Sequence, residues 1–238
     1  MSRLGFISDD ALIQVVRHLL EIAEKARAKA EKDLERNVID PFAVLFEMSG
    51  FNSDQQGWLA GEKNRQAQKS LQNHVGAFHQ IVLGKVEGWQ DLGTGSVVDL
   101  VSTDRKIIAE IKNKHNTVKG SDKVKVYDQM ETLVMTKGHQ YKGYTAYYVE
   151  IIPKAGLRYD KEFTPPDSAI GQLRRPNPLI RQIDGYGFYE LVTGQVGALA
   201  QLFEVLPDVI EACSDYRFAD RQFAKAFFAK AFGALKVQ

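Results

Sequence analysis

The chain lacks the cysteine pairs and zinc-ligand spacings that stabilise many small secreted or zinc-binding domains. Its 238 residues include one cysteine, Cys213, which excludes an intrachain disulfide, and no cysteine and histidine spacing suggests a zinc site. We find no signal peptide and no apolar run long enough to span a membrane, so we expect a cytoplasmic protein without a membrane partner. The net charge of +1 is low for a nucleic-acid binder, although a protein can concentrate positive charge in one cleft.

Two apolar stretches are each interrupted by an acid. VVDLVS at 97–102 and KIIAEIK at 106–112 are rich in β-branched residues, and the polar residues between them predict a hairpin turn. A loop of two residues (104–105) or four (103–106) places Asp99 opposite Glu110, with Lys112 on the same face of the sheet. A loop of odd length would instead place Asp99 opposite Ala109 or Ile111. Asp-Arg is not a favoured two-residue turn, so four is the better even length.

Asp99, Glu110 and Lys112 together predict a metal-dependent site that cleaves phosphodiesters. The two carboxylates and the carbonyl of Ile111 are hard oxygen ligands that suit Mg²⁺, and Lys112 would polarise the attacking water and stabilise negative charge. An acid-x-Lys triplet is expected by chance about twice in such a chain, and Asp104-Arg105-Lys106 is a competitor in the turn. The alternative interpretation is an edge strand with a solvent-facing Glu-Lys ladder.

Basic segments follow the predicted hairpin. The loop after Lys112 has the composition of a phosphate-contacting and base-reading segment, with a solvated charge run as the alternative; its candidate DNA-binding residues are Asn113, Lys114, His115, Asn116, Lys119 and Lys123. Four of the seven prolines lie in the segment 165–185, together with three arginines. Because arginine pairs bidentately with guanine, this segment is a candidate for G·C readout, or else a lid that contacts phosphates, through Arg174, Arg175 and Arg181.

The remaining pattern predicts an α/β fold. We expect a helix over 62–83, a strand over 85–92, the hairpin strands, a helix over 122–136 with Asp122 as its N-cap and Gly138 as its stop, and a strand over 144–152. This order, αβββαβ, predicts a mixed central sheet flanked by helices.

Helices are also expected at both ends of the chain. We predict an amphipathic helix over 11–37 and a short helix beginning at Asp40-Pro41, which pack on the core or on a second subunit. Near the C-terminus we predict a helix whose aromatic residues belong to the core and whose basic stripe is solvated; these are Phe218, Phe223, Phe227 and Phe228, and Arg217, Arg221, Lys225 and Lys230.

The residues DLVSTDRKIIAEIKNKHNTVKGSDK at 99–123 resemble a type II restriction endonuclease of the PD-(D/E)xK superfamily, and more narrowly the enzymes that cut the interrupted palindrome GGNCC. The resemblance is strongest over 70–150 and includes, more weakly, IDGYGFYELVTG at 183–194; the superfamily's proline before the first acid is replaced by Val98. It implies a restriction-endonuclease-like core with Asp99, Glu110 and Lys112 as the catalytic residues and Mg²⁺ as the cofactor. It also makes Glu62, at the start of the long helix, a possible extra metal contact, against the alternative of a surface acid near a helix N-terminus.

We therefore expect one endonuclease domain over 1–238, with an N-terminal helical part at 8–50, a catalytic core at about 60–155 and a C-terminal recognition and helical part at 160–238. The expected substrate is double-stranded DNA with a short palindrome, cut by a homodimer, with a cognate DNA methyltransferase as genetic partner. The alternatives are a structure-specific or repair nuclease with the same fold, and a catalytically silent DNA-binding protein. For His74 and His79, a hydrogen-bonded structural role is favoured over catalysis.

Overall fold

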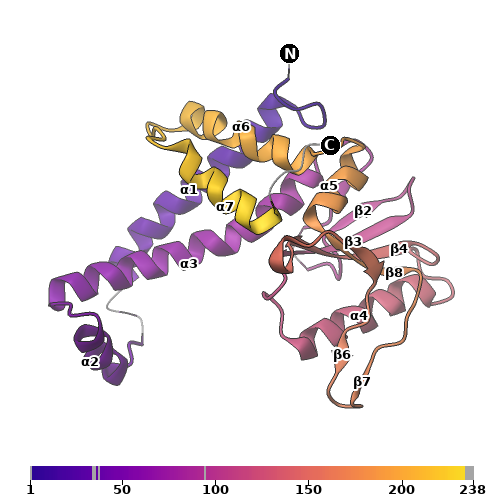
Figure 1. Ribbon diagram of the computed structural model, residues 1–238, viewed down its shortest axis with the longest axis horizontal. Coiled ribbons are helices and arrows are strands. Elements are labelled where there is room, and N and C mark those ends of the chain that lie inside the picture. Colours follow the sequence, from indigo (N-terminus) through magenta and orange to yellow (C-terminus); the bar gives the residue numbers. More distant parts are fainter. Residues whose placement is uncertain (1, 34–35, 37, 94, 234–238) are drawn as a thin grey trace. The chain divides into compact units, whose positions relative to one another are not determined.

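The protein is represented by a computed structural model that describes residues 2–33, 36, 38–93 and 95–233. These residues form two compact units, which we call the helical unit (residues 14–78) and the sheet unit (residues 1–13 and 79–238). Figure 1 labels the elements along the chain. No helix within the described ranges is both long enough and apolar enough to cross a lipid bilayer. The prediction of one domain over the whole chain stays a prediction.

The helical unit contains α2 (Pro41–Gly50) and most of α1 (Asp9–Asp33) and α3 (Gln55–Leu83). The predicted N-terminal helix is confirmed as α1, and residues 34, 35 and 37 of that prediction lie outside the described residues. The predicted start at Asp40-Pro41 is also confirmed, because the Asp40 carboxylate accepts a hydrogen bond from the Phe42 amide at 2.9 Å.

The long helix α3 begins earlier than the sequence predicts. It starts at Gln55, where the Asp54 carboxylate accepts a hydrogen bond from the Gly57 amide at 2.7 Å, so the start predicted at residue 62 is wrong. Glu62 therefore lies two turns inside the helix and is buried, not exposed near its N-terminus. The misplaced start has a simple cause, since Gly57 and Gly61 are poor helix formers and conceal the first two turns in the sequence.

The sheet unit is built on a mixed six-stranded sheet, which confirms the predicted fold class. Its strand order is β1-β2-β3-β4-β8-β5, in which β3, β4 and β8 are parallel and the other neighbours are antiparallel. The strands are β1 (Gln90–Asp91), β2 (Leu100–Ser102), β3 (Ile107–Lys114), β4 (Thr145–Ile152), β5 (Asp160–Glu162) and β8 (Ile180–Asp184). A separate hairpin of β6 (Pro166–Asp167) and β7 (Gln172–Leu173) is formed by the proline-rich segment.

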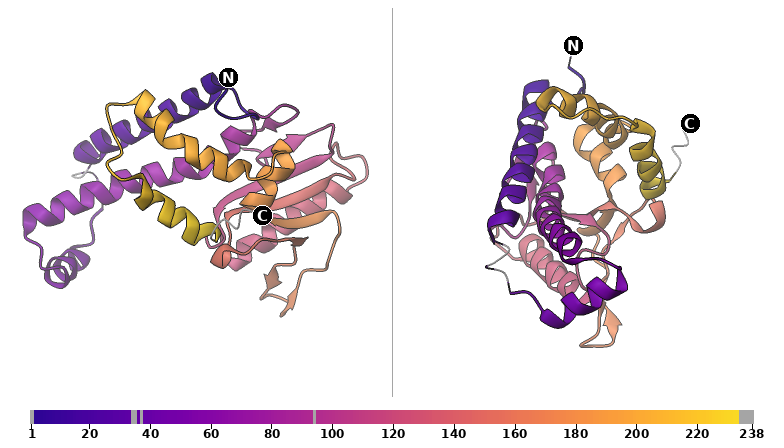
Figure 2. Two further views of the ribbon diagram at one scale, coloured as in Figure 1. Left: turned by 45° about the horizontal axis from the view of Figure 1, so that its top comes forward. Right: turned by 90° about the vertical axis from the view of Figure 1, so that its left-hand side faces the viewer.

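Helices of the sheet unit pack on both faces of this sheet (Figures 1 and 2). On one face, α4 (Gly120–Met135) places Tyr127 and Met130 in a buried cluster with Ile108 and Tyr148 of the strands. On the other face, Phe188 of α5 (Gly185–Thr193) contacts Tyr147 of β4. The order α3, β1, β2, β3, α4, β4 is the predicted αβββαβ. The chain continues through η1 (Lys154–Gly156), α6 (Ala198–Cys213) and α7 (Arg221–Phe232).

Two predicted boundaries differ from the structure. The strand predicted over 85–92 is reduced to β1, because the Trp89 amide donates to the Val86 carbonyl at 3.1 Å and closes a turn over 86–89. The predicted N-cap Asp122 is wrong: Lys119 is the N-cap, since its carbonyl accepts the Lys123 amide at 3.0 Å and already starts the helix. Asp122 lies in the first helical turn, where its charge is favoured by the helix dipole.

The aromatic residues of α7 are only partly in the core. Phe228 is buried and stacks on Phe203 of α6, whereas Phe223 and Phe227 are 67% and 60% exposed. Residues four apart lie on one helix face, so Phe223 and Phe227 share the face that α6 does not cover. The prediction that all four phenylalanines of this region are core residues is therefore wrong for these two.

The closest backbone approach in the sheet unit gives a test of the packing between α5 and β4. A Cβ added at Gly185 would lie 2.7 Å from the Ile151 Cα and 2.9 Å from its carbonyl carbon, both backbone atoms. We expect Gly185→Ala to lower the free energy of unfolding by roughly 1–3 kcal/mol, as overpacking does. Chemical denaturation measures this change.

Gly61 of α3 is the matched control, because a Cβ added there meets nothing within 4 Å. Gly61→Ala should instead raise the free energy of unfolding by about 0.5–1 kcal/mol, since alanine is the better helix former. Equal stability changes of the two variants would contradict this account of the packing.

Candidate active site

The hairpin of β2 and β3 determines which acids meet. Ser102 pairs with Ile107 and Leu100 pairs with Ala109, so the connecting turn has four residues, 103–106. The Lys106 amide donates to the Thr103 carbonyl at 3.2 Å, and Lys106 takes a positive φ of 52° to close the turn. The ladder ends at the pair of Leu100 and Ala109, because Asp99 lies one residue before β2 and its amide donates to the Ala109 carbonyl at 2.8 Å. The strand predicted over 97–102 is therefore shorter than expected, and the predicted pairing of Asp99 with Glu110 is wrong. The four-residue loop expected from the sequence is confirmed.

Asp99, Glu110 and Lys112 converge at one place on this hairpin. Asp99 Oδ2 accepts a hydrogen bond from the backbone amide of Ile111 at 2.6 Å, and Lys112 Nζ lies 2.5 Å from Glu110 Oε1. The Glu110 and Lys112 side chains are 13% and 27% exposed, so the group is partly withdrawn from water but still accessible. The solvent-facing ladder considered above does not describe these side chains.

Burial shifts the pKa values of both acids upward, and the charge of Asp99 adds to the shift of Glu110. Desolvation raises the pKa of Asp99, against the lowering effects of the Ile111 amide and the Lys112 charge. Desolvation and then the charge of Asp99 raise the pKa of Glu110 to about 7. Two carboxylates held this close cannot both ionise without a compensating cation, which Lys112 supplies only in part. The donor set therefore fits a hard divalent ion.

The residues that follow β3 form the basic loop. Asn113 and Lys114 end the strand, the His115 amide donates to the Ile152 carbonyl of β4 at 3.0 Å, and the Lys114 and Lys119 side chains are exposed. Asn116 is exposed as well, while the His115 Nδ1 atom is buried and has no hydrogen-bond partner among the described residues. The loop thus begins directly beside Lys112.

A buried carboxylate that the sequence did not single out holds the base of this loop. Glu150 of β4 is 3% exposed and is the register partner of Lys112. It accepts hydrogen bonds from Lys123 Nζ at 2.6 Å, Tyr159 Oη at 2.5 Å and Gln182 Nε2 at 3.0 Å. The available signal was an acid inside the apolar strand YTAYYVEII, the same signal that identifies Glu110.

Lys123 is part of the hydrogen-bond network around Glu150. Its ammonium group bonds both Glu150 and the His115 carbonyl, the latter at 3.1 Å, and it lies 5.4 Å from the centre of the Tyr148 ring. Its side chain is 19% exposed. As a DNA-binding candidate, Lys123 is therefore less free to reach a phosphate than Lys114 or Lys119.

The three arginines of the proline-rich segment are held differently. Arg174 Nη2 lies 2.7 Å from Asp128 Oδ2 and 3.5 Å from Asp167 Oδ2, and Arg181 Nε lies 2.7 Å from Asp160 Oδ1. Arg175 is exposed; its carbonyl accepts a hydrogen bond from Tyr127 Oη at 2.7 Å, but no ion pair with another described residue holds its guanidinium group. Of the three arginines, Arg175 has the side chain that is free to meet a ligand.

Comparison with known proteins identifies the group to which this arrangement belongs. The sequence model of the Eco47II restriction endonuclease family matches residues 4–214. The chain belongs to this family. It is 50% identical over 211 residues to the type II restriction enzyme Eco47II of Escherichia coli, which covers 89% of this chain and 88% of that enzyme. It is 32% identical over 212 residues to the type II restriction enzyme Sau96I of Staphylococcus aureus, covering 87% and 80% of the two chains.

In this member of the Eco47II family, the side chains of Glu62, His74 and His79 on α3 form hydrogen bonds with other residues of the chain. Glu62 accepts hydrogen bonds from Arg65 Nε and Gln66 Nε2, each at 2.7 Å, within the helical unit. His74 Nδ1 lies 2.8 Å from the Ser70 carbonyl, and the ring of His79 lies against Tyr189 with its Nδ1 2.8 Å from the hydroxyl. The structural role favoured for these two histidines agrees with these contacts.

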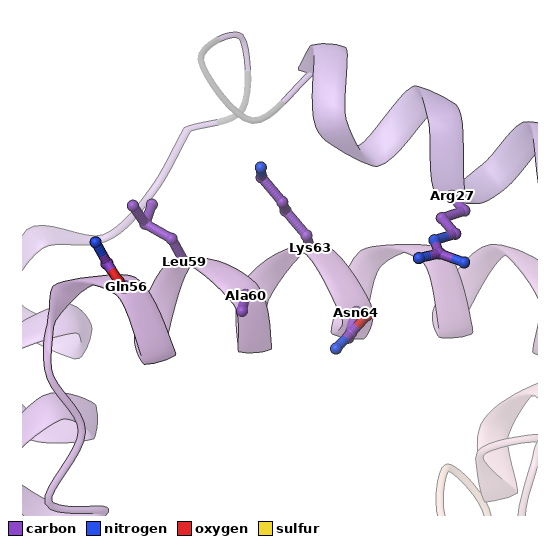
Figure 3. A pocket seen from close by; sticks show the side chains of 6 residues that line it. All are labelled: Arg27, Gln56, Leu59, Ala60, Lys63 and Asn64. Atoms are coloured by element: carbon purple, nitrogen blue, oxygen red, sulfur yellow. The ribbon is translucent and has the colours of Figure 1, made fainter.

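A surface hollow of the helical unit does not resemble the site on the hairpin. Figure 3 shows the side chains that line it, which come from α3 and, for Arg27, from α1: Arg27, Gln56, Leu59, Ala60, Lys63 and Asn64. None of these six side chains carries a carboxylate. This hollow is therefore not a second candidate for the active site of a restriction endonuclease.

The raised pKa of Glu110 predicts a pH effect on the metal-free Eco47II-family protein. The carboxyl has a pKa of about 7 when folded and an ordinary value of 4.5 when unfolded, so the folded state binds its proton more tightly. This contribution to stability is present below pH 4.5 and is lost as the pH rises through about 7. In chelator, the stability of Glu110→Gln relative to the wild type should therefore increase from pH 5 to pH 8.

Denaturation curves of both proteins at several pH values measure this difference, with Asp104→Asn in the exposed turn as the control. Parallel stability profiles of the wild type and Glu110→Gln would contradict the assigned environment of Glu110.

Proposed function

We propose that the chain is a Mg²⁺-dependent type II restriction endonuclease that hydrolyses both strands of double-stranded DNA at a short palindrome of the GGNCC kind. The observation that carries the proposal is the convergence of Asp99, Glu110 and Lys112 on one partly buried face, in a chain of the Eco47II restriction endonuclease family. A family likeness without these three side chains would not distinguish an active enzyme from a silent DNA-binding protein.

The roles of the residues follow from their chemistry. Asp99 and Glu110 would hold Mg²⁺ together with the Ile111 carbonyl, and the Ile111 amide keeps the Asp99 carboxylate in place at 2.6 Å. The bound ion would neutralise charge at the phosphate and lower the pKa of water. Lys112 would orient that water and stabilise the negative charge that develops on the phosphate oxygens.

The partners follow from the same proposal. Cleavage of both strands at a palindrome is most simply performed by a two-fold homodimer, because the symmetry of the protein then matches that of the site. A cognate DNA methyltransferase is the expected genetic partner, since the host DNA contains the same site. The proposed phosphate contacts are the exposed Lys114 and Lys119, with Asn113, His115 and Asn116 of the same loop near the base edges.

Replacing each member of the triplet tests the chemistry. Asp99→Ala and Glu110→Ala should abolish cleavage of plasmid DNA and weaken Mg²⁺ binding. Lys112→Ala should lower the cleavage rate by at least about 10²–10³-fold, the cost of removing a preorganised charge-stabilising group, while Mg²⁺ binding is kept. Rates of plasmid digestion, with calorimetry for Mg²⁺, measure these effects.

Asp104→Ala is the matched control, because Asp104 belongs to the competing acid-x-Lys triplet but is exposed in the turn. It should cleave at the wild-type rate, and chelator should stop cleavage in every sample. Structure-dependent nicking without discrete bands would favour the structure-specific nuclease, and full activity of Glu110→Ala would refute the proposed site.

Base readout and phosphate contact can be separated by binding measurements with Ca²⁺, which suits carboxylate sites but should not support turnover. Arg175→Ala should cost about 1–3 kcal/mol on the cognate duplex and little on a scrambled one, as loss of a bidentate guanine contact does. Lys119→Ala should weaken binding to both duplexes alike and reduce the salt dependence by about one unit of slope.

Arg181→Ala is the matched control for Arg175, because Arg181 would first have to leave its 2.7 Å ion pair with Asp160. The same argument applies to Arg174 and Asp128. If Arg175→Ala leaves the ratio of cognate to scrambled affinity unchanged, the bases are read elsewhere, and the loop residues Asn113, His115 and Asn116 become the next candidates.

A further inference from the structure

The helix α2 carries a large apolar surface that no described part of the chain buries. None of its residues is buried, and the exposed side chains in and beside it are those of Val38 (102%), Phe42 (72%), Leu45 (67%), Phe46 (78%) and Phe51 (79%). We call these five residues the α2 patch. Figure 1 labels the helix. Single exposed apolar residues are common on protein surfaces, but five within fourteen positions are not.

The sequence places three of these side chains on one stripe. Phe42, Leu45 and Phe46 are spaced i, i+3 and i+4, so they lie on the same side of the helix. The helix has only ten residues, and isolated helices below about 12–15 residues are marginal in water. Its N-cap Asp40 and the proline at its first position assist it, and its opposite face, with Val44 and Met48, is only half-buried. A partner on this stripe would supply further stabilisation.

The size of the α2 patch matches a specific protein interface. Residues of this size expose about 150–200 Å² each when free, so the exposed fractions of Phe42, Leu45 and Phe46 correspond to roughly 330–430 Å² on the stripe, and Val38 and Phe51 add roughly 270–360 Å² beside it. The largest apolar patch of a typical monomer measures about 300–600 Å². A standard interface buries about 800 Å² on each partner. The α2 patch is thus large enough to be the core of one.

The charges around the α2 patch exclude two other kinds of partner. No lysine or arginine occurs between residues 38 and 61. The acids there are occupied: Asp40 and Asp54 accept amide hydrogen bonds at helix starts, and Glu47 Oε2 accepts one from Trp58 Nε1 at 2.8 Å. Phosphates of nucleic acid or of anionic lipid require cations, and the segment 38–61 itself contributes none. Lys29, Arg65 and Lys69 of α1 and α3 line a hollow that includes Val38 but not Phe42, Leu45 or Phe46. An apolar, charge-poor patch is the composition of a homodimer core.

We propose that the α2 patch is the contact through which two copies of this chain associate. This inference rests on the proposed function, which requires two active sites related by a two-fold axis. In a two-fold dimer the same patch meets itself, so a self-complementary surface without net charge is needed, and the stripe of Phe42, Leu45 and Phe46 meets that need. The inference assigns the dimer contact to the helical unit, whereas Asp99 and Glu110 belong to the sheet unit.

Sedimentation of the full chain without DNA tests the assignment. The wild type should be a dimer at micromolar concentration, and Phe46→Asp should raise the dissociation constant of the dimer at least about tenfold, because two like charges are then placed at the contact. Phe46→Leu should keep the dimer. Unchanged far-UV circular dichroism would show that Phe46→Asp, at a position 78% exposed, has not unfolded the chain.

Phe223→Asp is the matched control, because Phe223 is 67% exposed on another helix, α7. It should leave the dissociation constant unchanged. A wild type that is monomeric both free and on DNA would overturn the inference, as would a Phe46→Asp dimer of wild-type strength. Binding of a monomeric wild type to phosphatidylcholine vesicles, lost in Phe46→Asp, would also overturn it.

The catalytic variants keep this test separate from the proposed function. Glu110→Ala should remain a dimer while cleaving nothing, and Phe46→Asp should fold, bind Mg²⁺ as the wild type does and cut both strands poorly at low protein concentration. Cleavage by the wild type with an unaltered Phe46→Asp dimer would refute the α2 contact alone. Dimers that depend on Phe46 but never cleave DNA would refute the proposed nuclease and leave the contact standing.

Discussion

Two carboxylates of like charge, held on one partly buried face of a hairpin, form the constraint on which the proposed chemistry depends. Asp99, one residue before β2, accepts a hydrogen bond from the Ile111 amide of β3, next to Glu110. Burial raises the pKa values of both acids, and the charge of Asp99 raises that of Glu110 further. Lys112, at 2.5 Å from Glu110, offsets part of the repulsion between the two acids. The remaining repulsion is not compensated within the folded protein, and this favours the binding of a hard divalent cation.

The parallel strand β4, beside the hairpin, also carries a buried acid, but hydrogen bonds satisfy the carboxylate of this one. Glu150, the register partner of Lys112, is as deeply buried as a core residue, but Lys123, Tyr159 and Gln182 satisfy its oxygens. A satisfied buried carboxylate rigidifies its surroundings, whereas an unsatisfied pair attracts a ligand. Because Lys123 also bonds the His115 carbonyl, this network connects the start of the basic loop to β4, the strand that pairs with β3 and Lys112.

A net charge of +1 is compatible with binding DNA when cations are distributed unevenly. Arg174 and Arg181 neutralise acids of their own chain, while Arg175, Lys114 and Lys119 keep exposed side chains. In the helical unit, by contrast, the segment 38–61 has no lysine or arginine and exposes the apolar side chains of Phe42, Leu45 and Phe46. The separation of charged and apolar surfaces assigns different kinds of contact to the two units.

The sequence by itself determined the order of elements, the mixed sheet and the three residues of the candidate site. Alternation along β3 places Glu110 and Lys112 on one face of the sheet, and an acid inside an apolar stretch singles out Asp99. These are local properties, since they depend on neighbours within fourteen residues. The same locality explains why α2 was found from Asp40 and Pro41 alone.

Only the tertiary structure decided which polar side chains pair with other residues of the chain and which remain available to a ligand. Asp128 and Asp160 form ion pairs with arginines 46 and 21 residues away, and Glu150 pairs with Lys123, which is 27 residues away on α4. Similarly, Phe228 is buried and Phe227 is exposed because α6 covers one face of α7. Pairing and burial of this kind depend on distances between elements that are remote in sequence, and periodicity within one element contains no information about them.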